Sequence, residues 1–181
     1  MKFRCLLFIA ALVGVPAPLS SAPSFSFSTL PVDGFQSGAP GTTVGYGYTL
    51  TNLDQVLWLS TTNLSAGTFA FASAASLFDF PILGPGQSTT VPYIQLAGTG
   101  LYEITINILS PEDYVNLGAF VLSADFYDSD PLLGGTFQFG EDQLANYTVV
   151  ADSTSTPEPA SLWVSAFGIL LLICGRKRFP E

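Results

Sequence analysis

The sequence predicts an all-β protein: an antiparallel β-sandwich or jelly-roll-like body, an N-terminal signal peptide and a single hydrophobic helix near the C-terminus. Three observations predict this architecture. Short apolar segments of the interval 25–152 alternate with Gly, Pro, Asn and Asp, no long stretch of it has a helical period, and each end of the 181-residue chain joins an apolar run to basic residues. A barrel is the second architecture that this pattern allows.

Residues 1–24 have the three parts of a secretory signal. Lys2 and Arg4 precede the apolar run 5–15, and prolines and small residues follow it. The run has 11 residues, about 16 Å of helix, which is too short to span a bilayer core of roughly 30 Å. We therefore expect cleavage by signal peptidase.

Two small-x-small patterns mark the predicted cleavage region, Ser20-x-Ala22 and Ala22-x-Ser24. The second is favoured because cleavage after the first would leave Pro23 at the new N-terminus. The predicted organisation is a signal peptide at 1–24, a β-sandwich domain at 25–152 and a sorting segment at 153–181.

The body contains eight predicted strands. The clearest is 100–109, where Tyr102, Ile104, Ile106 and Ile108 fall on one face and polar residues on the other. The others are predicted at 43–51, 56–61, 67–72, 88–96, 117–127, 135–139 and 147–151. Turn residues separate them, which favours two packed antiparallel sheets.

The charge of the body excludes several classes of function. All five basic residues lie at the chain ends, and of 14 acidic residues only Glu158 and Glu181 lie outside 25–156, which therefore holds twelve. A domain without Lys, Arg or His cannot neutralise phosphates, so nucleic acid is excluded as a partner. Catalytic triads and metal sites that need histidine are also excluded. Cys5 and Cys174, the two cysteines, lie in the terminal segments, so the body has no disulfide.

Aromatic residues of the predicted strands are expected to pack between the sheets. The segment 44–48 differs, because Gly45 and Gly47 fall on one face and Tyr46 and Tyr48 on the other. If they are exposed, Tyr46 and Tyr48 form a candidate platform for stacking sugar rings. The alternative is that both rings belong to the core.

Asp125, Asp128 and Asp130 form the densest acidic cluster, at the end of a predicted strand. Oxygen ligands on a loop are what Ca²⁺ prefers, so these three are candidate calcium ligands, and calcium is the one candidate cofactor. The spacing is not that of an EF-hand loop. The alternative is a solvated acidic turn.

Carboxylates and tyrosines are the only acid–base groups of the body, so a two-carboxylate glycosidase is the one familiar mechanism that the composition permits. Glu103, Glu112 and Glu141 are the candidates. The first lies on the polar side of an ordinary strand and the other two in turn-like segments. We therefore expect a protein that is not an enzyme.

The segment 153–181 has four parts in order: a polar spacer, then Pro157, Glu158 and Pro159, then an apolar run at 160–174, then Arg176, Lys177 and Arg178. The apolar run has 15 residues, about 22 Å of helix, which crosses a membrane if the bilayer thins or the flanking cations snorkel. The positive-inside rule keeps those cations in the cytoplasm and the acidic body outside.

This order of parts resembles the PEP-CTERM sorting signal of exported bacterial proteins, over Thr154 to Arg178. The resemblance implies that Pro157, Glu158 and Pro159 are recognised by exosortase, a membrane transpeptidase-like enzyme that cuts near them. It also implies that 160–174 is a transient membrane anchor and 176–178 a retention cluster. The extension 179–181 beyond the cations departs from the usual pattern.

Together these observations predict an exported, non-enzymatic protein with a structural or adhesive role. Its membrane-anchored precursor would cross the inner membrane and reach the cell envelope, the cell surface or the extracellular polysaccharide matrix. The expected partners are signal peptidase and exosortase, the membrane before processing, and extracellular polysaccharide. The alternative is a carbohydrate-binding or calcium-dependent adhesive module. Ice binding is disfavoured, because the Thr pairs at 42–43, 61–62 and 89–90 form no regular array.

Overall fold

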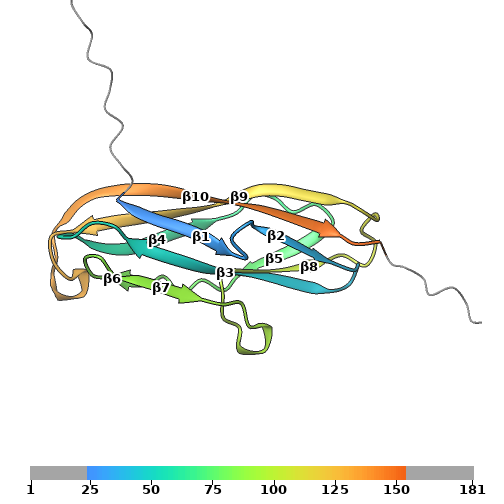
Figure 1. The fold of residues 1–181 in the computed structure, drawn as a ribbon, viewed down its shortest axis with the longest axis horizontal. Helices are drawn as coiled ribbons and strands as arrows, with labels where there is room; N and C mark the ends of the chain where they lie inside the picture. Colours follow the sequence, from blue (N-terminus) through green and yellow to red (C-terminus); the bar gives the residue numbers. More distant parts are fainter. Residues whose placement is uncertain (1–23, 154–181) are drawn as a thin grey trace, which may run out of the picture.

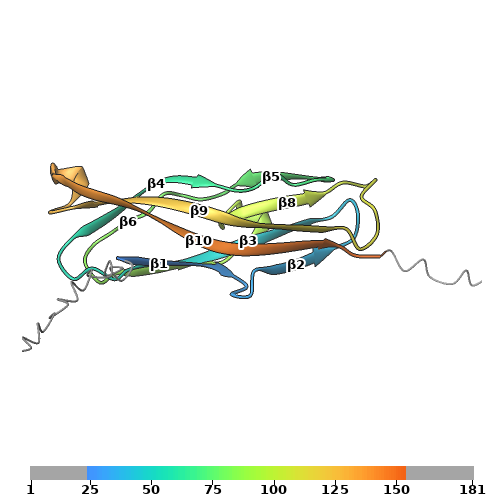
Figure 2. The same cartoon turned by 90° about the horizontal axis from the view of Figure 1, so that it is seen from above.

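The computed structural model describes residues 24–153 and shows two β-sheets packed face to face (Figures 1 and 2). The elements of this part are β1 (Phe25–Leu30), β2 (Phe35–Gly38), β3 (Thr43–Asn52), β4 (Trp58–Ser65), β5 (Ala72–Ser76), β6 (Ile82–Leu83), β7 (Ser88–Val91), the 3-10 helix η1 (Gln95–Ala97), β8 (Tyr102–Ile106), β9 (Val115–Tyr127), the 3-10 helix η2 (Pro131–Leu133) and β10 (Phe137–Ala151). The predicted all-β body with two packed sheets is confirmed. The predicted signal peptide and C-terminal helix lie outside the described residues.

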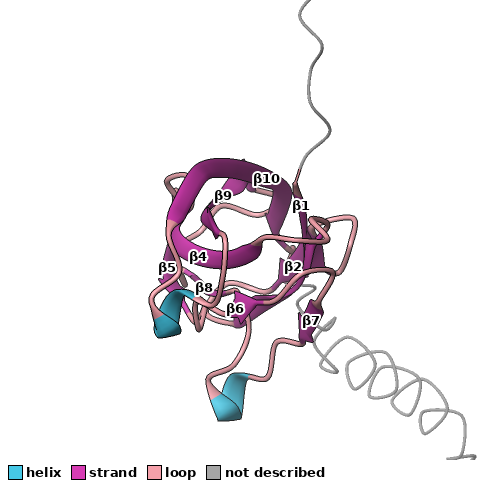
Figure 3. Cartoon of the chain, turned by 90° about the vertical axis from the view of Figure 1, so that its left-hand side faces the viewer, coloured by secondary structure: helices cyan, strands magenta, loops and turns pink. Residues whose placement is uncertain are grey.

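Each sheet has five strands. In the first, the order is β1-β3-β8-β5, and β7 also pairs with β3. Residues 43–46 of β3 pair with β8, and residues 48–51 pair with β7. The second runs β2-β10-β9-β4-β6. All pairs are antiparallel except β2 and β10, which are parallel. Figure 3 views the sandwich end-on, with both sheets curved around the core.

The chain changes sheets between β1 and β2. β1 pairs with β3 in the first sheet, and β2 joins β10 in the second. In the turn between them, the Gly34 N–H donates to the Pro31 carbonyl at 3.0 Å, and Gly34 has φ of +66°. A Cβ on Gly34 would lie 2.1 Å from the carbonyl oxygen of Asn146, so only glycine fits. This crossing closes one side of the sandwich beside β10.

The core lies between the sheets and is built from alternate residues of facing strands. The second sheet contributes mainly Phe120, Leu122, Ala124, Phe126, Ala145, Tyr147, Val149 and Ala151. The first contributes Phe25, Phe27, Tyr46, Tyr48, Leu50, Ile104 and Ile106. Both sheets and this whole core lie within 24–153, so this part of the chain holds the parts that a domain needs to fold alone.

Strand limits differ from the predicted ones in several places. The predicted strand at 67–72 is mostly a connection, because the Asn116 side chain bonds the backbone N–H and carbonyl of Ala70 at 2.8 and 3.1 Å. The predicted strand at 100–109 ends at Ile106, so Ile108 is exposed. The segments 135–139 and 147–151 are not separate strands, since β10 runs unbroken through most of both and the residues between.

Candidate functional site

Tyr46 and Tyr48, the candidate stacking platform, do not lie at the surface. Both side chains are completely buried between the sheets. The faces of β3 are the reverse of those that a platform needs: the tyrosines turn inward, and Gly45 and Gly47 turn outward beneath the 92–93 backbone and the Tyr93 ring. The stacking prediction is therefore wrong, because neither ring is accessible to a ligand.

Tyr46 instead joins the two sheets. Its hydroxyl lies 2.9 Å from the carbonyl oxygen of Gly34 and 3.0 Å from that of Thr148, and donates to them. Its ring meets Phe120 edge-on, with the centroids 5.3 Å apart. Burial raises the pKa of Tyr46 above its ordinary value, against the opposing effect of the Thr148 bond. The hydroxyl therefore stays protonated at neutral pH and serves as a structural donor.

Tyr48 has a partner near the surface. Its hydroxyl donates to the carboxylate of Asp79, and its ring packs edge-on against Phe78 with the centroids 4.8 Å apart. Burial first, and then the bond to Asp79, raises the pKa of Tyr48. This tyrosine too holds the fold.

Asp125, Asp128 and Asp130 do not form a common site. Asp125 lies within β9, opposite Gly140. Asp128 Oδ1 accepts from the N–H of Thr136 at 2.8 Å, and Asp130 Oδ1 accepts from the N–H of Leu132 at 2.9 Å. The bond from Thr136 holds the pKa of Asp128 below its ordinary value.

Residues 24–153 contain no group of three or more His, Cys, Asp or Glu side chains that could hold a metal ion. The structure therefore contradicts the three-aspartate calcium site. Asp128 and Asp130 instead form the turn that leads from β9 through η2 to β10, as side chains that accept from nearby backbone N–H groups commonly do.

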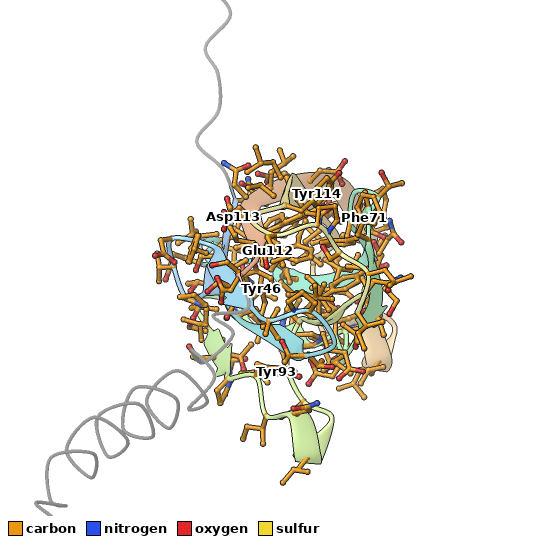
Figure 4. All side chains as sticks on the ribbon, turned by 90° about the vertical axis from the view of Figure 1, so that its right-hand side faces the viewer. Tyr46, Phe71, Tyr93, Glu112, Asp113 and Tyr114 are labelled. Carbon is orange, nitrogen blue, oxygen red and sulfur yellow. The ribbon has the colours of Figure 1, made fainter. Side chains whose placement is uncertain are left out.

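The glutamates considered for acid–base chemistry serve other contacts or lie apart. The Glu141 carboxylate accepts from the Ser24 N–H at 3.0 and 3.3 Å and from Gln143 Nε2 at 2.7 Å. Glu112 lies at the other end of β10, next to Asp113, whose N–H donates to the carbonyl of Ala151 (Figure 4). Ten strand residues, about 30 Å, separate Glu141 from Ala151, so Glu112 and Glu141 do not form a glycosidase pair, whose carboxyl groups lie within about 10 Å.

The candidate sorting residues Pro157, Glu158 and Pro159, the apolar run 160–174 and the cluster Arg176, Lys177 and Arg178 lie outside the described residues. Among residues 24–153, no helix is long and apolar enough to cross a membrane.

The 92–99 loop, between β7 and β8, is a feature that the sequence patterns missed, because 88–96 is predicted as one strand. The strand ends at Val91, before Pro92. Ile94 and Thr99 exchange backbone hydrogen bonds of 3.0 and 3.4 Å, and η1 forms the tip. Leu96 at this tip is 102% exposed and Ile94 is 50% exposed. Figures 1 and 3 show the loop projecting from the sandwich.

Tyr93 anchors the base of this loop against β3. A Cβ on Gly45 would lie 2.3 Å from Tyr93 Cε2, one on Gly47 would lie 2.9 Å from Tyr93 N, and one on Gly100 would lie 3.2 Å from Tyr93 Cα. The three glycines thus form a socket that side chains would block. Figure 4 shows Tyr93 at the base of the loop and Tyr46 deeper in the sandwich.

The outer side of the second sheet carries an apolar face, made of Phe35 on β2, Val115 and Leu117 on β9 and Leu144 on β10. These four side chains are between 45% and 72% exposed. They lie on adjacent strands, since Phe35 and Leu117 are both opposite Thr148. No charged residue occurs in 35–38, 115–124 or 143–151. Acidic residues follow just outside these segments, and an apolar centre with a polar rim is typical of a binding surface.

The outer side of the first sheet differs, because it carries rows of hydroxyl groups. Ser26, Thr51 and Ser88 form one row across β1, β3 and β7, and Ser28, Thr49 and Thr90 form the next. Thr51 and Ser88 are hydrogen-bonded at 2.8 Å, and Thr49 and Thr90 at 3.1 Å. These pairs fix the positions of the side chains and leave each hydroxyl with further donor or acceptor capacity.

A depression of about 290 Å³ lies between β1 and β10. Asp33 is the one ionisable residue among those that line it, and its Oδ1 accepts from the N–H of Phe35 at 3.1 Å. The depression therefore lacks the pair of acid–base groups that hydrolysis of a glycosidic bond requires.

The fold and these features define a β-sandwich domain whose candidate functional sites are exposed faces of its sheets. No family model matches the chain, and no curated protein matches it. Among solved structures, the chain is similar to the ASH/PapD-like domain of human CEP192 (PapD-like domain 7), at 9% identity and a TM-score of 0.38, over 82% of this chain and 99% of that one. It is also similar to AggA, the major subunit of aggregative adherence fimbriae type I from Escherichia coli, at 17% identity and a TM-score of 0.27, over 69% of this chain and 93% of that one. At these TM-scores the similarities do not assign the chain to either family.

Proposed function

We propose that this chain is an exported, non-enzymatic β-sandwich protein with a structural or adhesive role at the cell envelope, at the cell surface or in the extracellular polysaccharide matrix. The observation that carries this proposal is the apolar face, where Phe35, Leu117 and Leu144 are exposed together on a well-packed domain. Exposed apolar patches with a polar rim are typical of contacts with macromolecules. The polar atoms of Tyr46, Tyr48 and Asp128 are meanwhile engaged in holding the fold.

The ends of the sequence support export and sorting. Lys2, Arg4 and the apolar run 5–15 have the composition of a signal peptide. Pro157, Glu158 and Pro159, followed by an apolar run and three cations, have the order of a PEP-CTERM signal. A membrane segment that is later removed serves as a temporary address, and the mature product need not span a membrane.

The test is to follow the protein in its producing cell. The natural chain is compared with a variant in which Pro157, Glu158 and Pro159 are all changed to Ala, and Pro180→Ala serves as the matched control. We expect the natural chain and the control to be accessible to protease on intact cells or to be recovered in the matrix, and the triple variant to stay in the membrane fraction. An intracellular natural chain, or equal distribution of all three, would contradict the proposal.

A second candidate is binding of neutral polysaccharide through the hydroxyl rows, favoured by the uncharged, hydrogen-bonded array of Thr49, Thr51, Ser88 and Thr90. Electrophoresis through gels that contain a neutral glycan tests it. Retardation of the natural protein and its loss in Thr49→Val/Thr51→Val, which keeps the side-chain shape, is the expected result. Equal mobility of the two proteins would reject this candidate.

A further inference from the structure

We propose that the protein associates head to tail with further copies of itself: the tip of the 92–99 loop of one copy binds the apolar face of the next. The tip is Ile94 and Leu96, and the apolar face is Phe35, Val115, Leu117 and Leu144. This inference goes beyond the proposed function, which names no protein partner, and it does not depend on export.

The tip is closed by hydrogen bonds, and nothing else in residues 24–153 covers Leu96. The backbone bonds between Ile94 and Thr99 close the loop, and the Gly98 N–H donates to the Gln95 carbonyl at 3.2 Å. Tyr93 fixes the base in its glycine socket. An ordered loop that holds a leucine fully in solvent gains nothing from that exposure within the domain, whereas the same leucine binds an apolar surface without further ordering of the loop.

The charge distribution is compatible with contact between the tip and the apolar face. The interval 25–156 holds twelve acidic and no basic residues, so two copies repel each other wherever these carboxylates approach. Residues 81–102, which include the loop, contain no charged residue, and neither do the three segments that carry the apolar face. These two uncharged apolar features can meet without burying an unpaired carboxylate, which would oppose association strongly.

The position of the two features determines the kind of assembly. Figures 1 and 3 both place β9 and β10 on the opposite side of the molecule from the 92–99 loop. A contact between different surfaces on opposite sides leaves one free tip and one free face in every dimer. The contact is therefore heterologous, and the assembly grows as a chain of copies.

Sedimentation of residues 24–153 over a wide range of concentration tests the proposal. We expect concentration-dependent association of the natural sequence, weakened about tenfold or more by either Leu96→Asp or Leu117→Asp. Leu132→Asp is the matched control, because Leu132 is equally exposed, at 79%, but lies on η2. A natural sequence that stays monomeric, or a control that weakens association as much as the two variants, would overturn the proposal.

Mixing the two variants separates head-to-tail contact from other modes. Leu96→Asp keeps the face and loses the tip, and Leu117→Asp keeps the tip and loses the face, so neither assembles alone but the two together form a one-to-one dimer that grows no further. Unchanged melting temperatures would show that both variants are folded. A mixture that fails to pair although both proteins are folded would overturn the proposal.

Cysteine trapping gives an independent readout, because residues 24–153 contain no cysteine. A mixture of Leu96→Cys and Leu117→Cys proteins should form the mixed disulfide on mild oxidation, faster than either protein links to itself or to Leu132→Cys. Preferred linking of Leu96→Cys to itself would instead indicate a symmetric dimer and overturn the proposal. None of these results depends on where the cell sends the protein, so they are distinguishable from failure of the proposed function.

Discussion

Two tyrosine hydroxyls in the core of this domain lie in contrasting environments. The Tyr46 hydroxyl donates to the carbonyls of Gly34 and Thr148 and thereby links the β1–β2 connection, where the chain changes sheets, to β10. The Tyr147 hydroxyl is buried close to Gly67 and Gly118, and no hydrogen bond of normal geometry reaches it. The same chemical change at the two positions therefore has different consequences.

Tyr46→Phe is expected to lower the free energy of unfolding by about 0.5–1.5 kcal/mol, because the carbonyls of Gly34 and Thr148 lose the hydrogen bond from its hydroxyl. Tyr147→Phe is the matched control and is expected to change it by less than about 0.5 kcal/mol, since its hydroxyl makes no hydrogen bond of normal geometry. Urea unfolding followed by fluorescence measures both. Equal losses in the two variants would contradict these hydrogen-bond assignments.

The raised pKa values of Tyr46 and Tyr48 predict a loss of stability in alkali. Their folded-state pKa values lie above the unfolded value of about 10, so their contribution is complete below that pH and is lost as the pH rises through the folded-state values. The body has no Lys, Arg, His or Cys, so tyrosines are the side chains that titrate there. Urea unfolding at a series of pH values should show stability falling above pH 10, with a shallower fall in Tyr46→Phe/Tyr48→Phe. A flat profile would contradict the assignment.

The sequence could predict that Tyr46 and Tyr48 share a face of β3, but not which face is inside. Strand alternation gives a period of two and no direction. The stacking hypothesis required Gly45 and Gly47 to face inward, but they face outward, where Tyr93, far along the chain, packs over them. The aspartates were misassigned for a related reason. Spacing alone does not distinguish ligands from side chains that accept from turn N–H groups, as Asp128 and Asp130 do.

At the scale of elements, strands with clear alternation were predictable and their connections were not. The inward positions Ile104 and Ile106 follow the predicted face of β8. β1 and β2 were missed, because β1 lies directly after the signal-like segment and β2 has only four residues. β10 was divided in two, because Gly140, Glu141 and Asp142 have turn composition but pair with β9 in a long hairpin.

The glycine socket of the 92–99 loop predicts a coupled effect of two substitutions. Gly45→Ala places a Cβ 2.3 Å from the Tyr93 ring and is expected to cost about 1–3 kcal/mol of stability by overpacking. The same change in a Tyr93→Ala background should cost at least about 1 kcal/mol less, because the ring that it meets is gone. A double-mutant cycle by urea unfolding measures this difference. Strictly additive losses would show that the socket does not hold the loop.

At the scale of the whole molecule, Ser24, which the predicted boundary assigns to the signal peptide, contacts the β-sandwich. The Ser24 N–H donates to the Glu141 carboxylate, and its carbonyl accepts from the N–H of Leu53 at 2.9 Å. Cleavage after Ser24 would remove both contacts, whereas cleavage after Ala22 keeps them. We therefore expect the mature chain to begin at Pro23, at the site that the sequence alone disfavoured. Edman sequencing checks this, and a mature chain that begins at Phe25 would contradict it.

The proposed export also has a whole-molecule consequence for charge. If both ends are removed, all five basic side chains leave with them, and the product keeps only acidic charges in its body. We expect such a product to avoid polyanions at low salt. Its expected binding partners are neutral glycans or uncharged protein surfaces, such as the apolar face of another copy. The sequence was sufficient for this expectation, because charge requires no knowledge of packing.

The intact mass and location of the mature protein, in its producing cell with and without exosortase, test the proposed export and sorting most directly. We expect a chain that begins at Pro23, ends close to Pro157 and leaves the inner membrane only when exosortase is present. A chain that keeps the segment 160–181 in the membrane under both conditions would contradict it.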